Sequence, residues 1–326
     1  MPLTTNAETL TTSTSLVSTL RTAAGPSVSK AHRPAHAKGH LLTGSFTPNL
    51  AITSSLTTAP HLTSATPIPL TARFSSSTGL PKIPDTNPNA NPRGLALRFH
   101  LPSGADGRRK HTDIVTHSTP LFPTRTGAEF LQFLQAATSP DAATLVPKFL
   151  EAHPSTQRFL GTPKPSPESF ASEAYFGVNA FWLVGGEAGK KRTAVRYRVE
   201  PVEGRRVLGE EEVKGKGEEY LYEDLVARLL GEQKKEIRFK LKAQVALPTD
   251  VVDDATVLWP EEREVVELGE VVLDNLVQDG EESERLQKEI IFDPIPRVEG
   301  VEASEDPLLE VRANVYLVSG RERRAA

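Results

Sequence analysis

The chain contains no cysteine among its 326 residues, and its single methionine is Met1. The missing thiols exclude disulfides, cysteine-held zinc or iron–sulfur sites, and cysteine nucleophiles. No apolar run approaches the roughly 18 residues of a transmembrane helix, and the N-terminus lacks the apolar segment of a signal peptide. The C-terminal Arg-Arg-Ala-Ala is not a peroxisomal signal. We therefore expect an intracellular, cytoplasmic protein with no integral membrane span.

Basic residues are not in excess. The chain has 38 Lys and Arg against 42 Asp and Glu, a formal net charge of −4. Without a basic surplus to neutralise phosphates, we expect no nucleic-acid partner. Hydrophobic residues make up 38% of the sequence, which is enough to bury one large core or two small ones.

A short stretch near the C-terminus predicts a helix that presents two functional groups on one face. Asp306 is a suitable N-cap, and Pro307 suits the first helical position. Arg312 and Tyr316 are four residues apart, so they lie one above the other. A cation held against a phenol favours the phenolate, an oxygen ligand that ferric haem iron accepts. The simpler alternative is a buried tyrosine whose hydroxyl is satisfied by the arginine.

Elsewhere the hydrophobic pattern alternates as in strands more often than it recurs as in helices. We expect strands at residues 41–47, 68–75, 94–101, 111–118, 174–184, 193–199, 237–246 and 264–273, with a turn at 185–191. Helices are expected at residues 8–23, 128–136, 142–153, 218–230 and 281–290. Antiparallel strands with inserted helices predict an α+β fold built around a barrel. No stretch has the composition of a linker, so we predict one domain over residues 1–326, with a frayed tip at 1–11.

Six further motifs follow one another along the chain. They are RPAHAKG at 33–39, ARFS at 72–75, NPRG at 91–94, DIVTHSTP at 113–120, VLWP at 257–260 and ELG at 267–269. Together with the Arg312 to Tyr316 helix, and in this order, they resemble blocks of the haem catalase superfamily. The resemblance is stronger to its short branch, the catalase-related (SrpA-like) peroxidases, and runs from about residue 12 to residue 323.

The resemblance implies a catalase-like α+β fold. Its core is an antiparallel eight-stranded β-barrel with inserted helices, and a C-terminal helix lies on the proximal side of the haem. The chain stops just after this helix, so we expect it to lack the C-terminal helical domain of large catalases. The implied cofactor is haem b, iron protoporphyrin IX.

Carried over residue by residue, the resemblance also implies the groups that hold the haem. Tyr316 would be the axial ligand of the iron, kept as phenolate by Arg312. Phe130 would lie against the distal face of the macrocycle. Three arginines would pair with the propionates, namely Arg33, Arg73 and Arg323. Arginine suits this task because its charge is permanent and its fork binds carboxylates bidentately. Surface salt bridges are the alternative for Arg33 and Arg73.

The same resemblance implies that His36 is the distal acid and base, with Ser75 hydrogen-bonded to its other ring nitrogen. Peroxide heterolysis needs a group that takes a proton from one oxygen and returns it to the other, and a neutral imidazole serves both steps. Without the resemblance, a surface histidine in a basic loop would be the simpler interpretation of His36.

Two positions depart from the catalase pattern. His117 stands where catalases carry the distal asparagine that orients the second peroxide, which puts efficient disproportionation in doubt. The alternative is that His117 turns away from the iron and only packs. Asn179 stands where larger catalases carry a proximal-side histidine, and it should alter the hydrogen-bond network behind the tyrosine.

The sequence therefore predicts a haem-dependent peroxidase that reduces hydrogen peroxide and organic hydroperoxides with an organic electron donor, in response to oxidative stress. A fatty-acid hydroperoxide dehydratase similar to the allene oxide synthases and a true catalase are the enzymatic alternatives. A non-catalytic barrel that binds haem or apolar ligands is the alternative outside enzymes. We expect a homo-oligomer smaller than the catalase tetramer.

Overall fold

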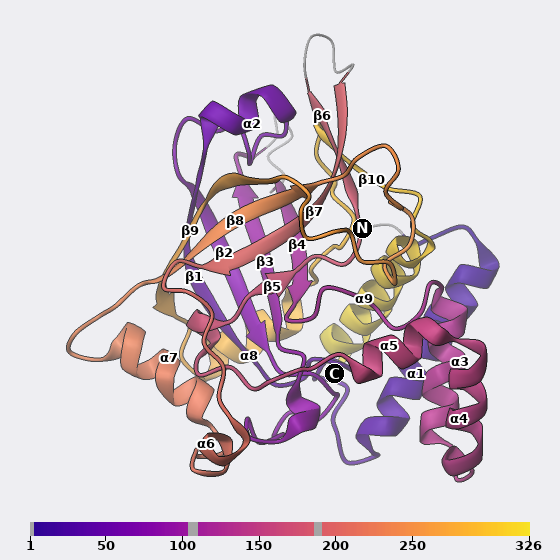
Figure 1. Ribbon diagram of the computed structural model, residues 1–326. Helices are drawn as coiled ribbons and strands as arrows, with labels where there is room; N and C mark the ends of the chain where they lie inside the picture. The colour runs from indigo at the N-terminus through magenta and orange to yellow at the C-terminus, as the bar shows by residue number, and fades with distance from the viewer. Residues whose placement is uncertain (1–2, 104–109, 186–190) are drawn as a thin grey trace.

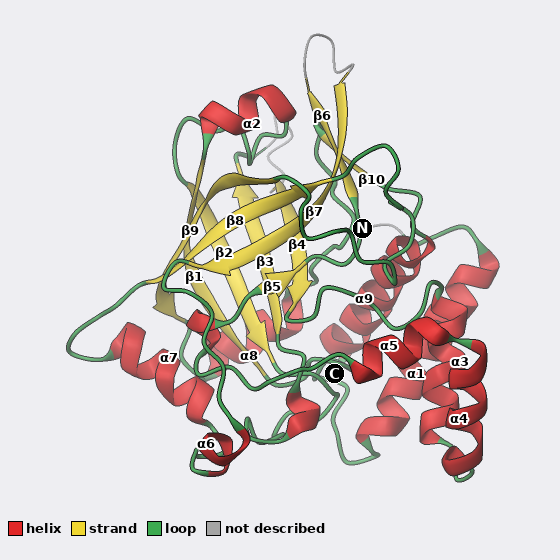
Figure 2. Ribbon diagram, in the orientation of Figure 1, coloured by secondary structure: helices red, strands yellow, loops and turns green. Residues whose placement is uncertain are grey.

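Eight antiparallel strands close into a barrel (Figure 1, Figure 2). The computed structural model describes residues 3–103, 110–185 and 191–326. The ring runs β1-β2-β3-β4-β5-β7-β8-β9, and β9 pairs with β1 to complete it. Its strands are β1 (Gly39–Pro48), β2 (Ile68–Ser75), β3 (Gly94–Leu101), β4 (Lys110–His117), β5 (Tyr175–Phe176), β7 (Lys191–Pro201), β8 (Ile237–Val245) and β9 (Val265–Leu276). The expected eight-stranded α+β barrel is confirmed.

The barrel closes because alternate residues of each strand are apolar and point inward, where they fill the interior. Along β8, Ile237, Phe239, Leu241 and Ala243 are buried, with more exposed residues between them. Aromatic rings pack across the interior, and the centroids of Phe74 and Tyr175 lie 5.9 Å apart. This is a packed core, and the site described below lies outside it, between the barrel and the helices.

One expected strand, residues 174–184, is two strands in the structure. β5 and β6 (Phe181–Gly185) pair with the same edge of β7, but residues 178–180 between them leave that edge. The short strand β10 (Val301–Ala303), which the sequence pattern did not predict, extends the sheet beyond β6. The expected turn at 185–191 lies mostly outside the described residues, although Gly185 and Lys191 are paired as the ends of a hairpin. The break in the strand matters because it carries Asn179 toward the C-terminal helix.

Helices cover one flank of the barrel and both its ends (Figure 2). The C-terminal helix α9 (Pro307–Ala325) packs along α1 (Ala7–Ala24), and α3 (Gly127–Thr138) and α8 (Glu281–Glu289) contact it as well. The other helices are α2 (Leu50–Leu56), α4 (Ala142–Ala152), α5 (Pro154–Gly161), α6 (Glu210–Lys214) and α7 (Tyr220–Leu230), with short 3-10 turns at Pro88–Ala90 and Phe170–Ser172. In the described part of the chain, no helix has the length and apolar content needed to cross a membrane.

The N-terminal segment contacts the C-terminal helix. α1 begins at Ala7, and the Asn6 side chain caps it by accepting a hydrogen bond from the Thr9 amide over 3.0 Å. The Thr4 amide donates to Asn314 Oδ1 on α9 over 2.9 Å. The start of the described chain is thus bonded to α9 across the sequence, whereas fraying of residues 1–11 stays a prediction.

Candidate active site

The C-terminal helix α9 presents Arg312 and Tyr316 on one half-buried face. Asp306 caps the helix by accepting from the Leu308 amide over 2.9 Å, and Pro307 occupies its first position. Leu309 and Ala313, which lie close to Tyr316 around the helix, are buried. Arg312 donates to Asn179, which lies between β5 and β6, so this face of the helix is directed toward the barrel sheet.

Three hydrogen-bonded polar side chains lead to the Tyr316 hydroxyl. Arg312 Nη2 donates to Tyr316 Oη over 3.3 Å, and Arg312 Nη1 donates to Asn179 Oδ1. Asn179 Nδ2 in turn donates to Asp306 Oδ2 over 2.8 Å. Burial raises the pKa of the Asp306 carboxyl, while the bonds from Leu308 and Asn179 oppose that rise. The buried amide of Asn179 thus fixes the arginine that holds the phenol, and the break between β5 and β6 puts it there.

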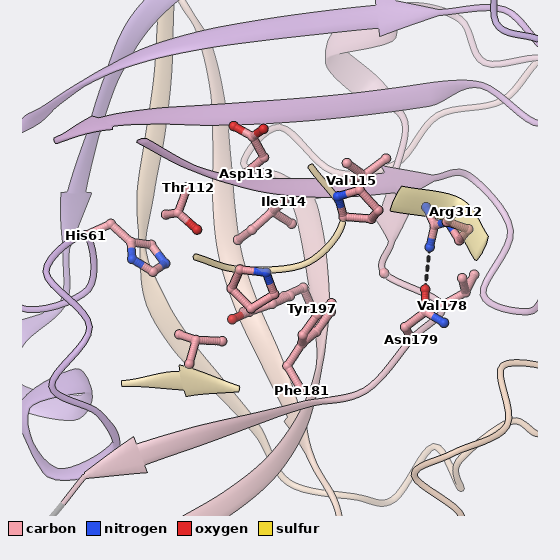
Figure 3. A pocket seen from close by; sticks show the side chains of 14 residues that line it. His61, Thr112, Asp113, Ile114, Val115, Val178, Asn179, Phe181, Tyr197 and Arg312 are labelled. Carbon is pink, nitrogen blue, oxygen red and sulfur yellow. Dashed lines mark hydrogen bonds between the residues drawn. The ribbon is translucent and has the colours of Figure 1, made fainter. Parts of the chain in front are cut away.

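A pocket lies behind this arginine (Figure 3). Asn179 and Arg312 line one end of it, β4 forms a wall, and His61 lies at the other end. The His61 imidazole is buried, and its Nδ1 has no hydrogen-bond partner among the described residues. Burial alone lowers the pKa of His61 to about 3, so the ring is neutral at physiological pH.

His36 is held in an unusual backbone conformation. Its φ is +55°, a left-handed geometry that costs a non-glycine residue on the order of 1–3 kcal/mol. Arg73 Nη2 donates to the carbonyls of His36 and Ala37 over 3.0 and 3.1 Å, which stabilises the turn. Strain of this kind is kept where the surrounding structure over-determines it, as at functional sites.

The imidazole of His36 is oriented by two neighbours. Its Nδ1 lies 3.0 Å from Ser75 Oγ at the end of β2. Gly94 leaves the necessary space, because a Cβ there would lie 2.5 Å from Ser75 Oγ and 3.0 Å from His36 Nδ1. Burial, followed by the charges of Arg73 and Arg312, lowers the pKa of His36 to about 4. The ring is therefore a neutral base at pH 7, with Nε2 as its remaining nitrogen.

His117 lies beside this group, at the end of β4. It is paired with Gly94 across the sheet, and its Nδ1 accepts from the Thr119 amide over 3.3 Å. Burial, followed by the charges of Arg312 and His36, lowers the pKa of His117 to about 3. The structure thus brings two neutral imidazoles within electrostatic range of each other and of Arg312.

Three arginines from distant parts of the chain form a cluster near His36. Arg73 and Arg323 are buried and Arg33 is half-buried, and in the described part of the chain none of them has a carboxylate partner. Gln287 Oε1 and the Ile290 carbonyl accept hydrogen bonds from them. Burial, then mutual repulsion, lowers the pKa of Arg33 well below its usual value and that of Arg73 to about 9.

This cluster fits a dianionic ligand. Buried cations without an anion are costly, so a group with two carboxylates would relieve them. The Nε of Arg323 is also buried and has no hydrogen-bond partner in the described residues. A phenol held by an arginine, a neutral imidazole and this cationic cluster together match the donor set that a haem needs.

Phe130, the remaining predicted site residue, lies on α3. Its ring packs against Phe122 with centroids 5.0 Å apart, and it is half-buried. At the start of α3, Gly127 lies against α9, where a Cβ would be 2.5 Å from Val311 Cγ1. This close approach sets α3 beside α9 one turn before Phe130.

Two residues of the site were not predicted from the sequence. Gly94 lies in the NPRG motif, which signalled a turn but not the space that His36 needs. Gln287 lies in a charged helix, and nothing in its sequence neighbourhood marks it. Its partners Arg73 and Arg33 are 214 and 254 positions away in the sequence, so only the fold brings them together.

Comparisons with known proteins agree on one family. The family model described as Catalase matches residues 9–326. The chain is 32% identical over 294 residues to a protein named catalase-related peroxidase from Mycolicibacterium paratuberculosis, covering 88% of this chain and 87% of that protein. It is 30% identical over 307 residues to a protein of the same name from Synechococcus elongatus, covering 91% and 84%.

The fold comparison gives the same result. The crystal structure of a fungal catalase matches with a TM-score of 0.73 at 22% identity. The match covers 90% of this chain but 59% of the fungal chain, so the present chain spans only part of the longer protein.

Proposed function

The chain belongs to the catalase family, and on that basis we propose that it is a haem b peroxidase reducing hydrogen peroxide and organic hydroperoxides. Enzymes of this family are oxidoreductases that act on peroxide and use haem. The observation that carries the proposal is one constellation. An oriented neutral imidazole, an arginine-held phenol and an arginine cluster that has no carboxylate partner among the described residues come together between the barrel and α9.

In this proposal Tyr316 would bind the haem iron as phenolate, and Arg312 would favour that charged form. The propionates take their counter-charges from Arg33, Arg73 and Arg323. Phe130 would lie against the haem macrocycle. When bound, haem with an anionic axial ligand supplies the electron density that favours O–O cleavage.

His36 is the proton carrier. Its Nε2 takes the hydroperoxide proton and returns it to the departing oxygen, while Ser75 keeps the tautomer and ring orientation constant. Hydrogen peroxide leaves as two waters, and an organic hydroperoxide as an alcohol and a water. An organic donor supplies the two electrons and two protons that balance the reaction.

His117 favours the peroxidase over a true catalase. Disproportionation needs a second peroxide to be oriented for oxidation, and the bulkier imidazole of His117 stands where catalases carry an amide. We therefore propose removal of peroxide at the expense of an organic donor under oxidative stress.

The test follows peroxide, donor and dioxygen in one vessel with the haem-loaded protein. The proposal expects one donor oxidised for each peroxide consumed and little gas. Dioxygen released at half the amount of peroxide consumed, without a donor, would identify a catalase. Consumption of a fatty-acid hydroperoxide without donor or gas would identify a dehydratase.

A further inference from the structure

A neutral amide occupies the centre of the cationic cluster. Gln287 Oε1 accepts from Arg33 Nη1 and from Arg73 Nε, both over 2.8 Å. Gln287 Nε2 donates to the Gly39 carbonyl, also over 2.8 Å. Because the amide nitrogen is committed to a carbonyl, the oxygen is directed at the arginines. One side chain on α8 therefore orients two guanidinium groups from distant parts of the chain.

The end of α8 supports the same cluster. The Ile290 carbonyl accepts from Arg33 Nη2 over 3.1 Å and from Arg323 Nη2 over 2.9 Å. Carbonyls that follow a helix C-terminus carry partial negative charge, which suits them to accept from cations. All three arginines are thus held by the last turn of one helix and the residue after it.

These acceptors order the arginines without neutralising them. Arg73 uses Nε for Gln287 and Nη2 for the carbonyls of His36 and Ala37. Both hydrogens of its Nη1 are left without a protein partner in the described part of the chain. A glutamate at position 287 would stabilise the ligand-free cluster better than an amide does, because it would pair with two buried cations. The neutral residue leaves that charge for a ligand.

We propose that Gln287 is a positioning residue for the carboxylates of a porphyrin. It holds Arg33 and Arg73 as an oriented, uncompensated pair that receives a dicarboxylate. This inference rests on the proposed haem function for its ligand, but it concerns recognition of the carboxylates and not the chemistry at the iron.

Fluorescent zinc protoporphyrin IX and its dimethyl ester test the proposal, because the ester lacks the two negative charges. Each is titrated into the parent chain and into Q287E, Q287M and the control Q157E, which adds the same charge at an exposed position on α5. Unfolding midpoints of the ligand-free proteins are measured in parallel.

The expected result is that Q287E weakens binding of the free acid by about tenfold or more and leaves binding of the ester unchanged. Its ligand-free form should unfold at a higher temperature than the parent. Q287M should weaken binding of the acid to a smaller degree and lower the midpoint, since the arginines lose their acceptor. Q157E should match the parent.

Equal acid affinity for Q287E, Q287M and the parent would overturn the proposal, as would an equal loss of acid and ester affinity. If Q287E does not fold, the acid-to-ester affinity ratio of Q287M decides the matter. The fate of the peroxidase proposal is separate. The parent could bind the free acid more tightly than the ester through Gln287 and still, when loaded with haem, fail to consume peroxide. That result would support this inference and contradict the proposed function.

Discussion

Arg73 Nη2 donates to the main-chain carbonyl of His36 over 3.0 Å, and this bond joins the two halves of the site. The arginine belongs to the cluster that we propose for the propionates, and the histidine is the proposed base. The same guanidinium helps to stabilise the left-handed turn at His36 and to lower the pKa of its imidazole. Cofactor binding and orientation of the base should therefore be coupled through Arg73.

A substitution at Gly94 tests whether the contact between His36 and Ser75 orients the proposed base. Gly94→Ala places a methyl 2.5 Å from Ser75 Oγ and 3.0 Å from His36 Nδ1, so it should break their contact. We expect kcat/KM for peroxide to fall by about 100-fold, since a misplacement of about 1 Å can cost that much. Haem content should be unchanged. Gly161→Ala, where no atom lies within 4 Å of the added methyl, is the matched control. A Gly94→Ala enzyme of parental activity would refute the role of this contact.

The lowered pKa of His36 predicts the pH dependence of the peroxide reaction. Its folded-state pKa of about 4 lies below the ordinary value of 6.5, so the neutral, proton-accepting form predominates above pH 4. The second-order rate constant should be flat from about pH 5 to 8 and should fall as the pH drops through about 4. Stopped-flow mixing across this range measures it. A midpoint near 6.5 would show that His36 is not the base or is not buried as described.

Asn179 should determine the position of Arg312 beside Tyr316, the proposed iron ligand. Asn179→Ala removes the Asn179 donor to Asp306 and the acceptor of Arg312 Nη1, which should lower the free energy of unfolding by about 1–3 kcal/mol. The freed arginine should also shift the Soret band and the midpoint potential of the haem-loaded protein. Asn275→Ala, at an exposed position on β9, is the control and should change neither. An unchanged spectrum together with lowered stability would limit Asn179 to a structural role.

His117 should set the balance between peroxidase and catalase activity. His117→Asn introduces the amide that the resemblance to catalases implies for this position, and we expect the dioxygen released per peroxide to rise several-fold while donor oxidation falls. An oxygen electrode and donor absorbance record both. His111→Asn, an exposed exchange on the same strand, should leave the ratio unchanged. The account of specificity would be contradicted if His117→Asn also left it unchanged.

Much of the barrel was predictable because its strands alternate cleanly. The strands at 68–75 and 94–101 were predicted to the residue. The helix predicted over 8–23 is one residue shorter at each end than α1. The strand at 174–184 was predicted as continuous because Asn179 is flanked by residues that suit a strand. It is interrupted because Asn179 instead bonds to Asp306 and Arg312, far away in the sequence.

Helix α2 escaped prediction for a different reason. Its segment, Leu50–Leu56, is rich in Ser and Thr, which have low helix propensity, and packing against the barrel stabilises it. The site residues likewise differ in how far the sequence predicts them. Arg312 and Tyr316 were predicted because local spacing sets their contact, whereas Gln287 depends on contacts that only the fold creates.

The most direct test of the central claim compares the haem-loaded parent with Tyr316→Phe, using Tyr222→Phe as the control. The parent and Tyr222→Phe should show a high-spin ferric spectrum of the tyrosinate type and should consume peroxide with a donor. Tyr316→Phe should lose that spectrum and nearly all turnover. Full haem content, an unchanged Soret band and parental turnover in Tyr316→Phe would contradict the account.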